Sequence, residues 1–275
     1  MQVNIIECPR DAMQGLVHFI PTKRKIAYLN ALLKVGFPIL DALSFVSPKA
    51  VPQMADSQDV VKALPTTHSS QLLAIVVNDK GCDIWLQYPQ VHYAGFPLSL
   101  SPTFEKRNTQ RTQKAAWQAL LRLQNKALKH NKKVVVYLSM AFGNPYGDAY
   151  TPTLVTQAIQ KLQNEGIKHI SLADTLGLAT TTQIQTCFKQ SLRIAPEINL
   201  SLHLHARHQD VINKTKAAVH AGCQNIEGTI GGIGGCPFAN DKLVGNMDTE
   251  LILKALKTQG CKTNINTKAL LKLKQ

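Results

Sequence analysis

The segment NLSLHLHARHQDVINKTKAAVHAGCQNIEGT, residues 199–229, carries the pattern that decides the fold. Short apolar runs at Asn199–Leu202 and Asn225–Thr229 predict two strands, and the amphipathic stretch Val211–Ala221 between them predicts a helix. A strand, a crossover helix and a second strand form the unit that places both strands parallel in one sheet.

The same alternation runs along the whole chain. Further strands are predicted at Val3–Glu7, Pro38–Ala42, Leu72–Val77, Val91–Gly95, Val134–Leu138 and His169–Leu172. Further helices are predicted from Thr22, as N-cap, to Gly36, and at Ala115–Leu128, Pro152–Glu165 and Thr181–Leu192. Eight such units predict an α/β fold, a single closed (β/α)8 TIM barrel over residues 1–275, with C-terminal helices from about residue 248. An open doubly wound sheet is the alternative, but it would need a glycine-rich turn where Cys8–Asp11 stands.

Composition excludes several classes of protein. With 44% hydrophobic residues the 275-residue chain can bury a large core, which argues against disorder. No apolar run approaches the ~18 residues of a membrane span, and the N-terminus lacks the basic region of a signal peptide. We therefore expect a cytoplasmic protein without membrane contact. The six cysteines form no C-x-x-C pair, which predicts reduced thiols.

The formal net charge of +14 suits an anionic ligand or a nucleic acid. The lysines and arginines are spread along helical stretches such as Arg122–Lys133, without a dense basic block. This spacing favours a solvated face, with attraction of an acidic substrate as the alternative, and no nucleic acid is expected as partner. A non-enzymatic nucleic-acid-binding protein is the alternative from another class, and a steep salt dependence of DNA binding would identify it.

Polar residues gather where the predicted strands end, which is the active-site face of such a barrel. They are Arg10 and Asp11 after the first strand, Asp41 after the second, Asp174 after the sixth, His203 and His205 at the end of the seventh, and Gly231–Pro237 with Asn246 after the eighth.

The pair His203-Leu204-His205 is the sharpest local signal. Alternation along a strand points both imidazoles to the same side, so both can reach one ion. Asp11 ends a strand that lies near the seventh in a closed barrel, and it adds an oxygen ligand. Two imidazoles with oxygen donors suit Mg²⁺ or Mn²⁺ in an open site, although the same donors also bind Co²⁺ and Zn²⁺.

Cys236 follows a glycine-rich loop that can move and approach a ligand closely. We expect this thiol to be presented and reactive, whereas Cys187 and Cys223 lie on helical faces and are expected to be inert.

Several motifs together carry a family resemblance. They are Cys8-Pro9-Arg10-Asp11-Ala12-Met13-Gln14, Ser44-Phe45-Val46-Ser47-Pro48-Lys49 with Val51-Pro52-Gln53-Met54, Gly143-Asn144-Pro145-Tyr146-Gly147, Ser171–Gly177, the histidine pair, and Gly234-Gly235-Cys236-Pro237-Phe238-Ala239. From about Asn4 to Leu270 the chain resembles the 3-hydroxy-3-methylglutaryl-CoA lyases, metal-dependent TIM-barrel enzymes related to isopropylmalate synthase.

The resemblance implies a retro-Claisen cleavage of an acyl-CoA substrate to acetyl-CoA and acetoacetate, a divalent Mg²⁺ or Mn²⁺ as cofactor, and a homo-oligomer, in this family a dimer. It implies Asp11, His203, His205 and Asn246 as metal ligands, and Arg10, Asp41, Asp174, Cys236 and Glu250 as catalytic groups. Arg10 would stabilise the enolate and Cys236 would protonate it. Asp11, His203 and Asp174 are alternatives for the base that takes the proton of the substrate hydroxyl. A synthase or aldolase of the same barrel family is the alternative enzyme.

The chain departs from the family pattern in three places. Asp41 stands where the family usually has Glu, so its carboxylate ends one methylene shorter. Ala206-Arg207-His208-Gln209 replaces the common D-T-Y-G, which predicts a different loop after strand seven. The segment between Cys236 and Asn246 is one residue longer than usual, which makes Asn246 the least secure ligand.

Overall fold

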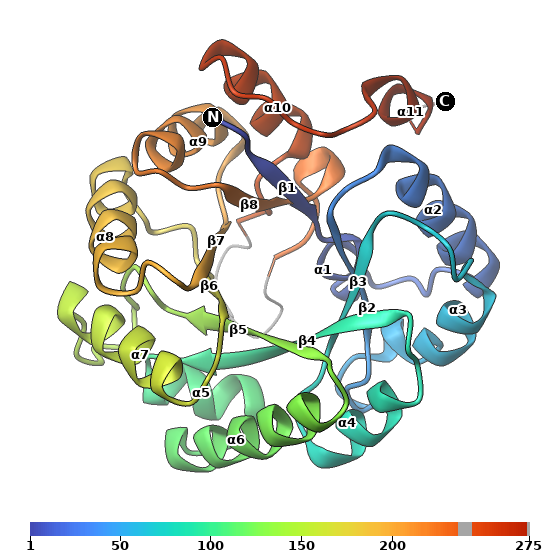
Figure 1. Cartoon of the computed structure of the whole chain (residues 1–275), viewed down its shortest axis with the longest axis horizontal. Coiled ribbons are helices and arrows are strands. Elements are labelled where there is room, and N and C mark those ends of the chain that lie inside the picture. Colours follow the sequence, from blue (N-terminus) through green and yellow to red (C-terminus); the bar gives the residue numbers. More distant parts are fainter. Residues whose placement is uncertain (236–243, 274–275) are drawn as a thin grey trace.

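The computed structural model describes residues 1–235 and 244–273, and its centre is a closed barrel of parallel strands in the order β1 to β8 (Figure 1). The strands are β1 (Asn4–Glu7), β2 (Ile39–Ser44), β3 (Gln71–Ile75), β4 (Val91–Ser99), β5 (Lys133–Ser139), β6 (His169–Asp174), β7 (Asn199–Leu204) and β8 (Asn225–Gly228). Pairing of Asn4 with Asn225 and of Glu7 with Gly228 closes the ring. The predicted barrel is confirmed.

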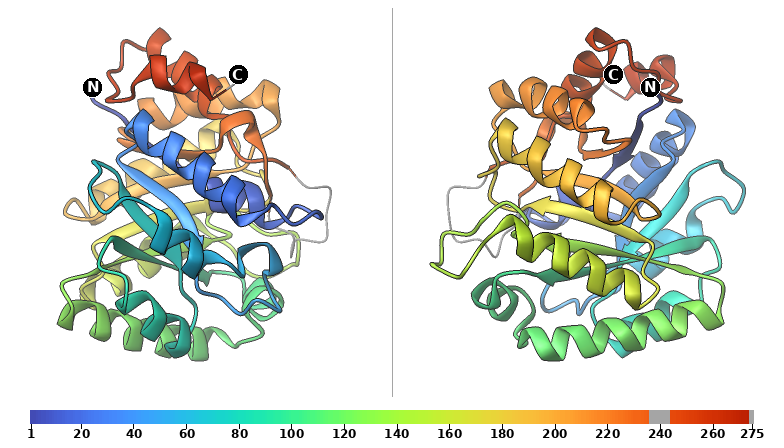
Figure 2. Two further views of the ribbon diagram at one scale, coloured as in Figure 1. Left: turned by 90° about the vertical axis from the view of Figure 1, so that its right-hand side faces the viewer. Right: turned by 60° about the vertical axis from the view of Figure 1, so that its left-hand side comes forward.

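Helices surround this ring and cover the outer face of the strands (Figures 1 and 2). They are α1 (Pro9–Gln14), α2 (Thr22–Val35), α3 (Ser57–Ala63), α4 (Asp79–Leu86), α5 (Pro102–Thr109), α6 (Gln113–Lys129), α7 (Pro152–Asn164), α8 (Thr181–Ile194), α9 (Val211–His220), α10 (Thr249–Thr258) and α11 (Thr267–Lys272), with short 3₁₀ turns η1 (Pro52–Met54), η2 (His208–Asp210) and η3 (Ile230–Gly232). The C-terminal helices expected from about residue 248 are α10 and α11.

One local prediction is wrong. Thr22 is the first residue of α2 rather than its N-cap, and Pro21 holds the capping position without a side-chain hydrogen bond. The Thr22 hydroxyl instead donates to Asp56 Oδ2 at 2.8 Å, which ties α2 to the residue before α3. Gly36 ends the helix as predicted, because its φ of 80° is a left-handed conformation that favours glycine.

Two apolar layers follow from strand alternation. The larger layer lies between strands and helices, and it includes fully buried Leu72, Ala74, Val134 and Val136. The residues between them point to the other face, where Leu73, Tyr93, Val135 and Tyr137 form a small separate cluster. This part of the barrel interior is therefore lined by aliphatic and aromatic side chains from β3 to β5.

Glu7, the last residue of β1, lies fully buried at the junction of three segments. Its Oε1 accepts the Ile230 backbone N–H at 2.8 Å, and its Oε2 accepts the Thr249 hydroxyl at 2.6 Å. One carboxyl group thus joins the first strand to the turn after β8 and to the first residue of α10.

Within the described parts of the chain, no helix combines the length and the apolar character that crossing a membrane requires.

Candidate active site and metal centre

A cavity of about 700 Å³ opens where the strands end, and Arg10, Asp11, His203 and His205 line it. The rest of its wall includes Tyr137 and Ser139 from β5, with Arg107 and Arg111 from α5 and the segment after it. Four of the residues predicted for the site are thereby brought together in one hollow. The cavity lies at the C-terminal ends of the strands, where active sites of such barrels are found.

Asp11, His203 and His205 form a buried cluster in which one ligand atom from each lies within 4.8 Å of the others. Asp11 reaches it because α1 begins directly after β1, with Pro9 in its first turn. His203 lies in β7 and His205 follows the strand by one residue, so alternation points both rings inward, as the sequence predicts. Asn246 lies beside them, since its Nδ2 donates to Asp11 Oδ2 at 2.6 Å.

The donor set of this cluster fits a divalent cation. The Nδ1 atoms of His203 and His205 are each held by an oxygen that can only accept, Glu227 Oε2 at 3.0 Å and the Val244 carbonyl at 2.9 Å. Each ring therefore keeps its Nε2 lone pair for an ion. Asp11 supplies an anion: burial opposes its ionisation, but Arg10, both histidines and the Asn246 hydrogen bond lower its pKa to about 2.

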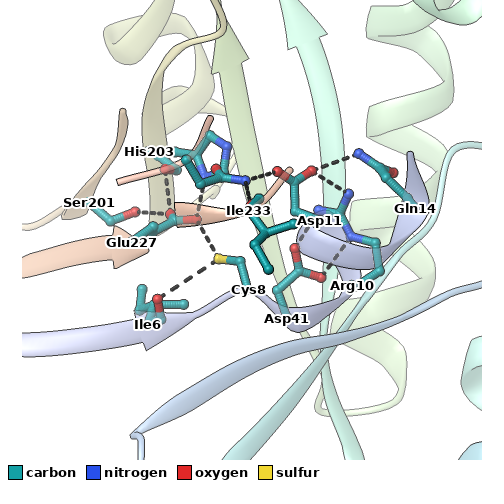
Figure 3. Close-up of polar contacts among 12 residues, drawn as sticks. Ile6, Cys8, Arg10, Asp11, Gln14, Asp41, Ser201, His203, Glu227 and Ile233 are labelled. Atoms are coloured by element: carbon teal, nitrogen blue, oxygen red, sulfur yellow. Dashed lines mark hydrogen bonds and ion pairs between the residues drawn. The ribbon is translucent and has the colours of Figure 1, made fainter. Parts of the chain in front are cut away.

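Arg10 is fixed by two carboxylates. Its Nη1 donates to Asp11 Oδ1 at 2.9 Å, its Nε donates to Asp41 Oδ1 at 3.1 Å, and its Nη2 also bonds Asp41 Oδ2 (Figure 3). Burial acts to lower the pKa of Arg10, but the carboxylates of Asp41 and Asp11 outweigh it and raise this pKa above its ordinary value. The guanidinium is a permanent cation held beside the cluster of Asp11, His203 and His205.

The expected place of Asp41 needs correction. It lies within β2, as the range of the predicted strand Pro38–Ala42 already implied, and not after the strand, and it is fully buried. The strand continues through this charged residue because Arg10 binds both carboxylate oxygens. Burial raises the pKa of Asp41 to about 6, with Arg10 acting in the opposite direction.

Asp174 ends β6 and holds the loop that follows it. Its oxygens accept the backbone N–H groups of Leu178 at 2.8 Å and Ala179 at 3.0 Å, and Lys214 Nζ at 3.0 Å. Lys214 also donates to the His205 carbonyl at 2.8 Å, so this ion pair connects the loops after β6 and β7. The contacts are those of a structural anchor, and the catalytic role of Asp174 stays a prediction.

The two remaining predicted catalytic residues are Glu250 and Cys236. Glu250 is in the first turn of α10, partly exposed, and its backbone N–H donates to Asp248 Oδ1 at 2.8 Å. Cys236 lies outside the described residues, so its predicted role stays a prediction.

Sequence reasoning missed a polar group inside the barrel. Glu227 of β8 accepts hydrogen bonds from Ser171 and Ser201 as well as from His203. The signal that could have identified Glu227 is a charged residue between two apolar neighbours, Ile226 and Gly228. The contact between Glu227 and His203 could not be predicted from the sequence, because it depends on how β7 and β8 lie beside each other.

The fold and the site together define a TIM-barrel protein with a candidate divalent-metal centre at its strand ends. The HMGL-like family model matches residues 2–275, and the chain belongs to this family. The resemblance predicted from the motifs is thereby confirmed.

Relatives and solved structures agree with this assignment. The chain is 31% identical to "Hydroxymethylglutaryl-CoA lyase YngG" of Bacillus subtilis over 96% of this chain and 87% of that protein. It is 30% identical to the mitochondrial hydroxymethylglutaryl-CoA lyase of Mus musculus, over 98% and 83%. A solved HMG-CoA lyase of Acinetobacter baumannii, in complex with coenzyme A and 3-methylmalate, is similar with a TM-score of 0.92, 27% identity, and 99% and 88% coverage.

Proposed function

We propose that this chain is a hydroxymethylglutaryl-CoA lyase, which cleaves 3-hydroxy-3-methylglutaryl-CoA into acetyl-CoA and acetoacetate. The observation that carries the proposal is the buried Asp11, His203 and His205 cluster beside Arg10, in a member of the HMGL-like family. The names of the relatives support the choice of substrate. We propose Mg²⁺ or Mn²⁺ as cofactor and Asp11, His203, His205 and Asn246 as its ligands.

The reaction breaks one carbon–carbon bond. The tertiary hydroxyl loses its proton and becomes the ketone of acetoacetate, while the bond's electron pair moves into the thioester as an enolate and is then protonated at carbon. A bound divalent ion supplies Lewis acidity at the substrate hydroxyl. Arg10 stabilises the enolate oxygen, and Asp41 and Asp11 hold its guanidinium in place before the charge develops.

Two proton transfers complete the cycle. For the base that takes the hydroxyl proton we propose Asp11, which lines the cavity, because the Nε2 lone pair of His203 would bind the metal and the Asp174 carboxylate is engaged by Lys214 and two backbone amides. We propose Cys236 as the acid that protonates the enolate carbon, on the strength of its motif.

The substrate is an anion, and the cavity wall is basic. Lys49, Arg107 and Arg111 line it together with Arg10, and Asp11 is the acidic residue among the described residues of its wall. A cavity of about 700 Å³ lies within the usual range of small-molecule sites. The related structure that contains coenzyme A supports an acyl-CoA ligand. A homodimer and a cytoplasmic location are further parts of this proposal.

The test is release of acetyl-CoA from 3-hydroxy-3-methylglutaryl-CoA, measured with and without EDTA. We expect activity that chelation abolishes and that added Mg²⁺ or Mn²⁺ restores. Full activity of a metal-free preparation, or no cleavage with either metal, contradicts the proposal.

A further inference from the structure

We propose that Glu227 is a positioning residue, which fixes His203 in the tautomer that turns Nε2 toward the candidate metal centre. The inference rests on the proposed function only in giving that nitrogen a metal to bind. Glu227 is in β8 and His203 in β7, and neither a motif nor a family resemblance singled out this carboxylate.

The contact itself defines the tautomer. Glu227 Oε2 lies 3.0 Å from His203 Nδ1, and both side chains are buried (Figure 3). An ionised carboxylate can only accept, so Nδ1 must carry the proton. The lone pair is then left on Nε2, on the side of the ring away from Glu227. Without this acceptor, neutral imidazole would be free to place its proton on either nitrogen.

Glu227 is itself held on several sides. Its Oε1 accepts the hydroxyls of Ser171 at 2.5 Å and Ser201 at 2.9 Å, and Cys8 Sγ lies 3.6 Å from Oε2 (Figure 3). The two hydroxyls come from β6 and β7 and hold the carboxylate, whereas the Cys8 sulfur, from the residue after β1, makes only a long contact. The hydrogen bonds offset the cost of burying a charge and leave it little freedom to move.

The two histidines are fixed by different means. The acceptor for His205 Nδ1 is the backbone carbonyl of Val244, which no side-chain substitution removes. The acceptor for His203 is a side chain. Substitution of Glu227 should therefore change the tautomer of His203 and leave that of His205 as it is, so His205 serves as an internal reference.

The experiment is ¹⁵N NMR of histidine-labelled, metal-free protein at a pH where the rings are neutral, with His203 assigned from the spectrum of H203Q. In the native protein we expect the shifts of a protonated Nδ1. In E227A we expect a substantial population protonated at Nε2, and an Mn²⁺ affinity lower by about 10–100-fold, the usual effect of removing such an outer partner. In E227Q the amide oxygen can still accept, so the native tautomer should persist.

Cys8→Ala is the matched control. It removes a long sulfur contact to the same carboxylate and leaves the bond to His203, so tautomer and Mn²⁺ affinity should stay native. If E227A folds and retains the native tautomer, the proposal is overturned, and E227Q with a lost tautomer would overturn it equally. Should the native protein bind no Mn²⁺ and cleave no substrate while E227A still shifts the tautomer, the proposed function fails and the positioning role stands.

Discussion

Arg10 shows how much one side chain depends on its neighbours. Its guanidinium donates to Asp41 through two nitrogens and to Asp11 through a third contact, so its position is set before any ligand arrives. Lysine keeps the charge but cannot reproduce this planar, two-point hold. The geometry of the cation is therefore as important as its charge.

Arg10→Lys and Arg10→Gln should lower kcat by roughly 10²–10³-fold, the scale expected when one preorganised donor to a developing oxyanion is lost. KM should change far less, because the interaction strengthens only in the transition state. Steady-state kinetics measure both. Arg122→Gln is the control, since its ion pair with Asp79 is exposed and neither residue lines the cavity. An effect confined to KM would make Arg10 a substrate anchor.

The cysteines should differ in reactivity. Cys8, Cys82, Cys187 and Cys223 are buried, and Cys261 is partly exposed. Burial raises the pKa of Cys187 to about 11 and that of Cys223 to about 12, which leaves little thiolate at neutral pH.

A limiting dose of iodoacetamide should therefore modify Cys236 first and Cys261 next, with activity falling in step with Cys236 and a bound substrate analogue protecting it. Peptide mapping by mass spectrometry gives the order. Modification of Cys82 before Cys236, with activity retained, would show that the loop thiol is inert.

At the scale of elements, the loop after β8 is built around close backbone approaches. Gly234 has a φ of 106°, and a Cβ there would lie 2.6 Å from Asn246 Nδ2 and 2.9 Å from the Asp11 carbonyl. Gly143 has a similar φ of 112°, but nothing lies within 4 Å of its would-be Cβ. The two glycines share the conformational requirement and differ in crowding.

Gly234→Ala should reduce Mn²⁺ affinity by about tenfold or more, because the methyl group displaces two predicted ligands. Gly143→Ala should lower stability by only about 1 kcal/mol, the cost of the backbone conformation, and leave the affinity native. Titration calorimetry and urea unfolding compare them. Equal affinities in the two variants would mean that the loop can shift without consequence for the metal centre.

Sequence patterns predicted some elements well and others poorly, for physical reasons. The long helices α6 to α9 were predictable because their apolar residues repeat at helical spacing over several turns. The short helices α1 and α3 have too few turns for such a repeat to be recognised. The histidine pair was predictable because strand alternation is local. The Asp41–Arg10 and Glu227–His203 contacts were not, since they depend on neighbouring strands whose relative register the sequence does not reveal.

At the scale of the whole molecule, the candidate metal centre joins distant parts of the chain. Asp11 follows β1, His203 lies in β7 with His205 directly after it, and Asn246 precedes α10. An ion held by these groups binds the folded state alone, because unfolding separates its ligands.

Mn²⁺ at about 100 times its dissociation constant should stabilise the fold by about 2.7 kcal/mol. For a chain of this size that is a rise in Tm of roughly 5 °C. Calorimetry with Mn²⁺ and with EDTA measures it, and the shift should be much smaller in His205→Ala. A native Tm that ignores the metal would contradict a centre formed by the folded barrel.

The carboxyl group of Glu7, which joins β1, the turn after β8 and α10, makes folding a proton-linked reaction. Burial raises its pKa from 4.5 to about 8, against the opposing hydrogen bonds of Thr249 and Ile230. At Glu7 the folded state therefore binds more protons than the unfolded state between these values, so the contribution of this group to the free energy of unfolding should be largest below pH 4.5 and decrease up to about pH 8. The group's share of that decrease is on the order of a few kcal/mol.

Urea unfolding in EDTA from pH 5 to pH 9 should show this slope, and Glu7→Gln should flatten it, because glutamine stays neutral and can still accept from the Ile230 amide. A slope unchanged in the variant would assign the effect to other groups. The expected slope means that at neutral pH a folding chain takes up a proton at Glu7, where the first and last strands meet, and releases it on unfolding.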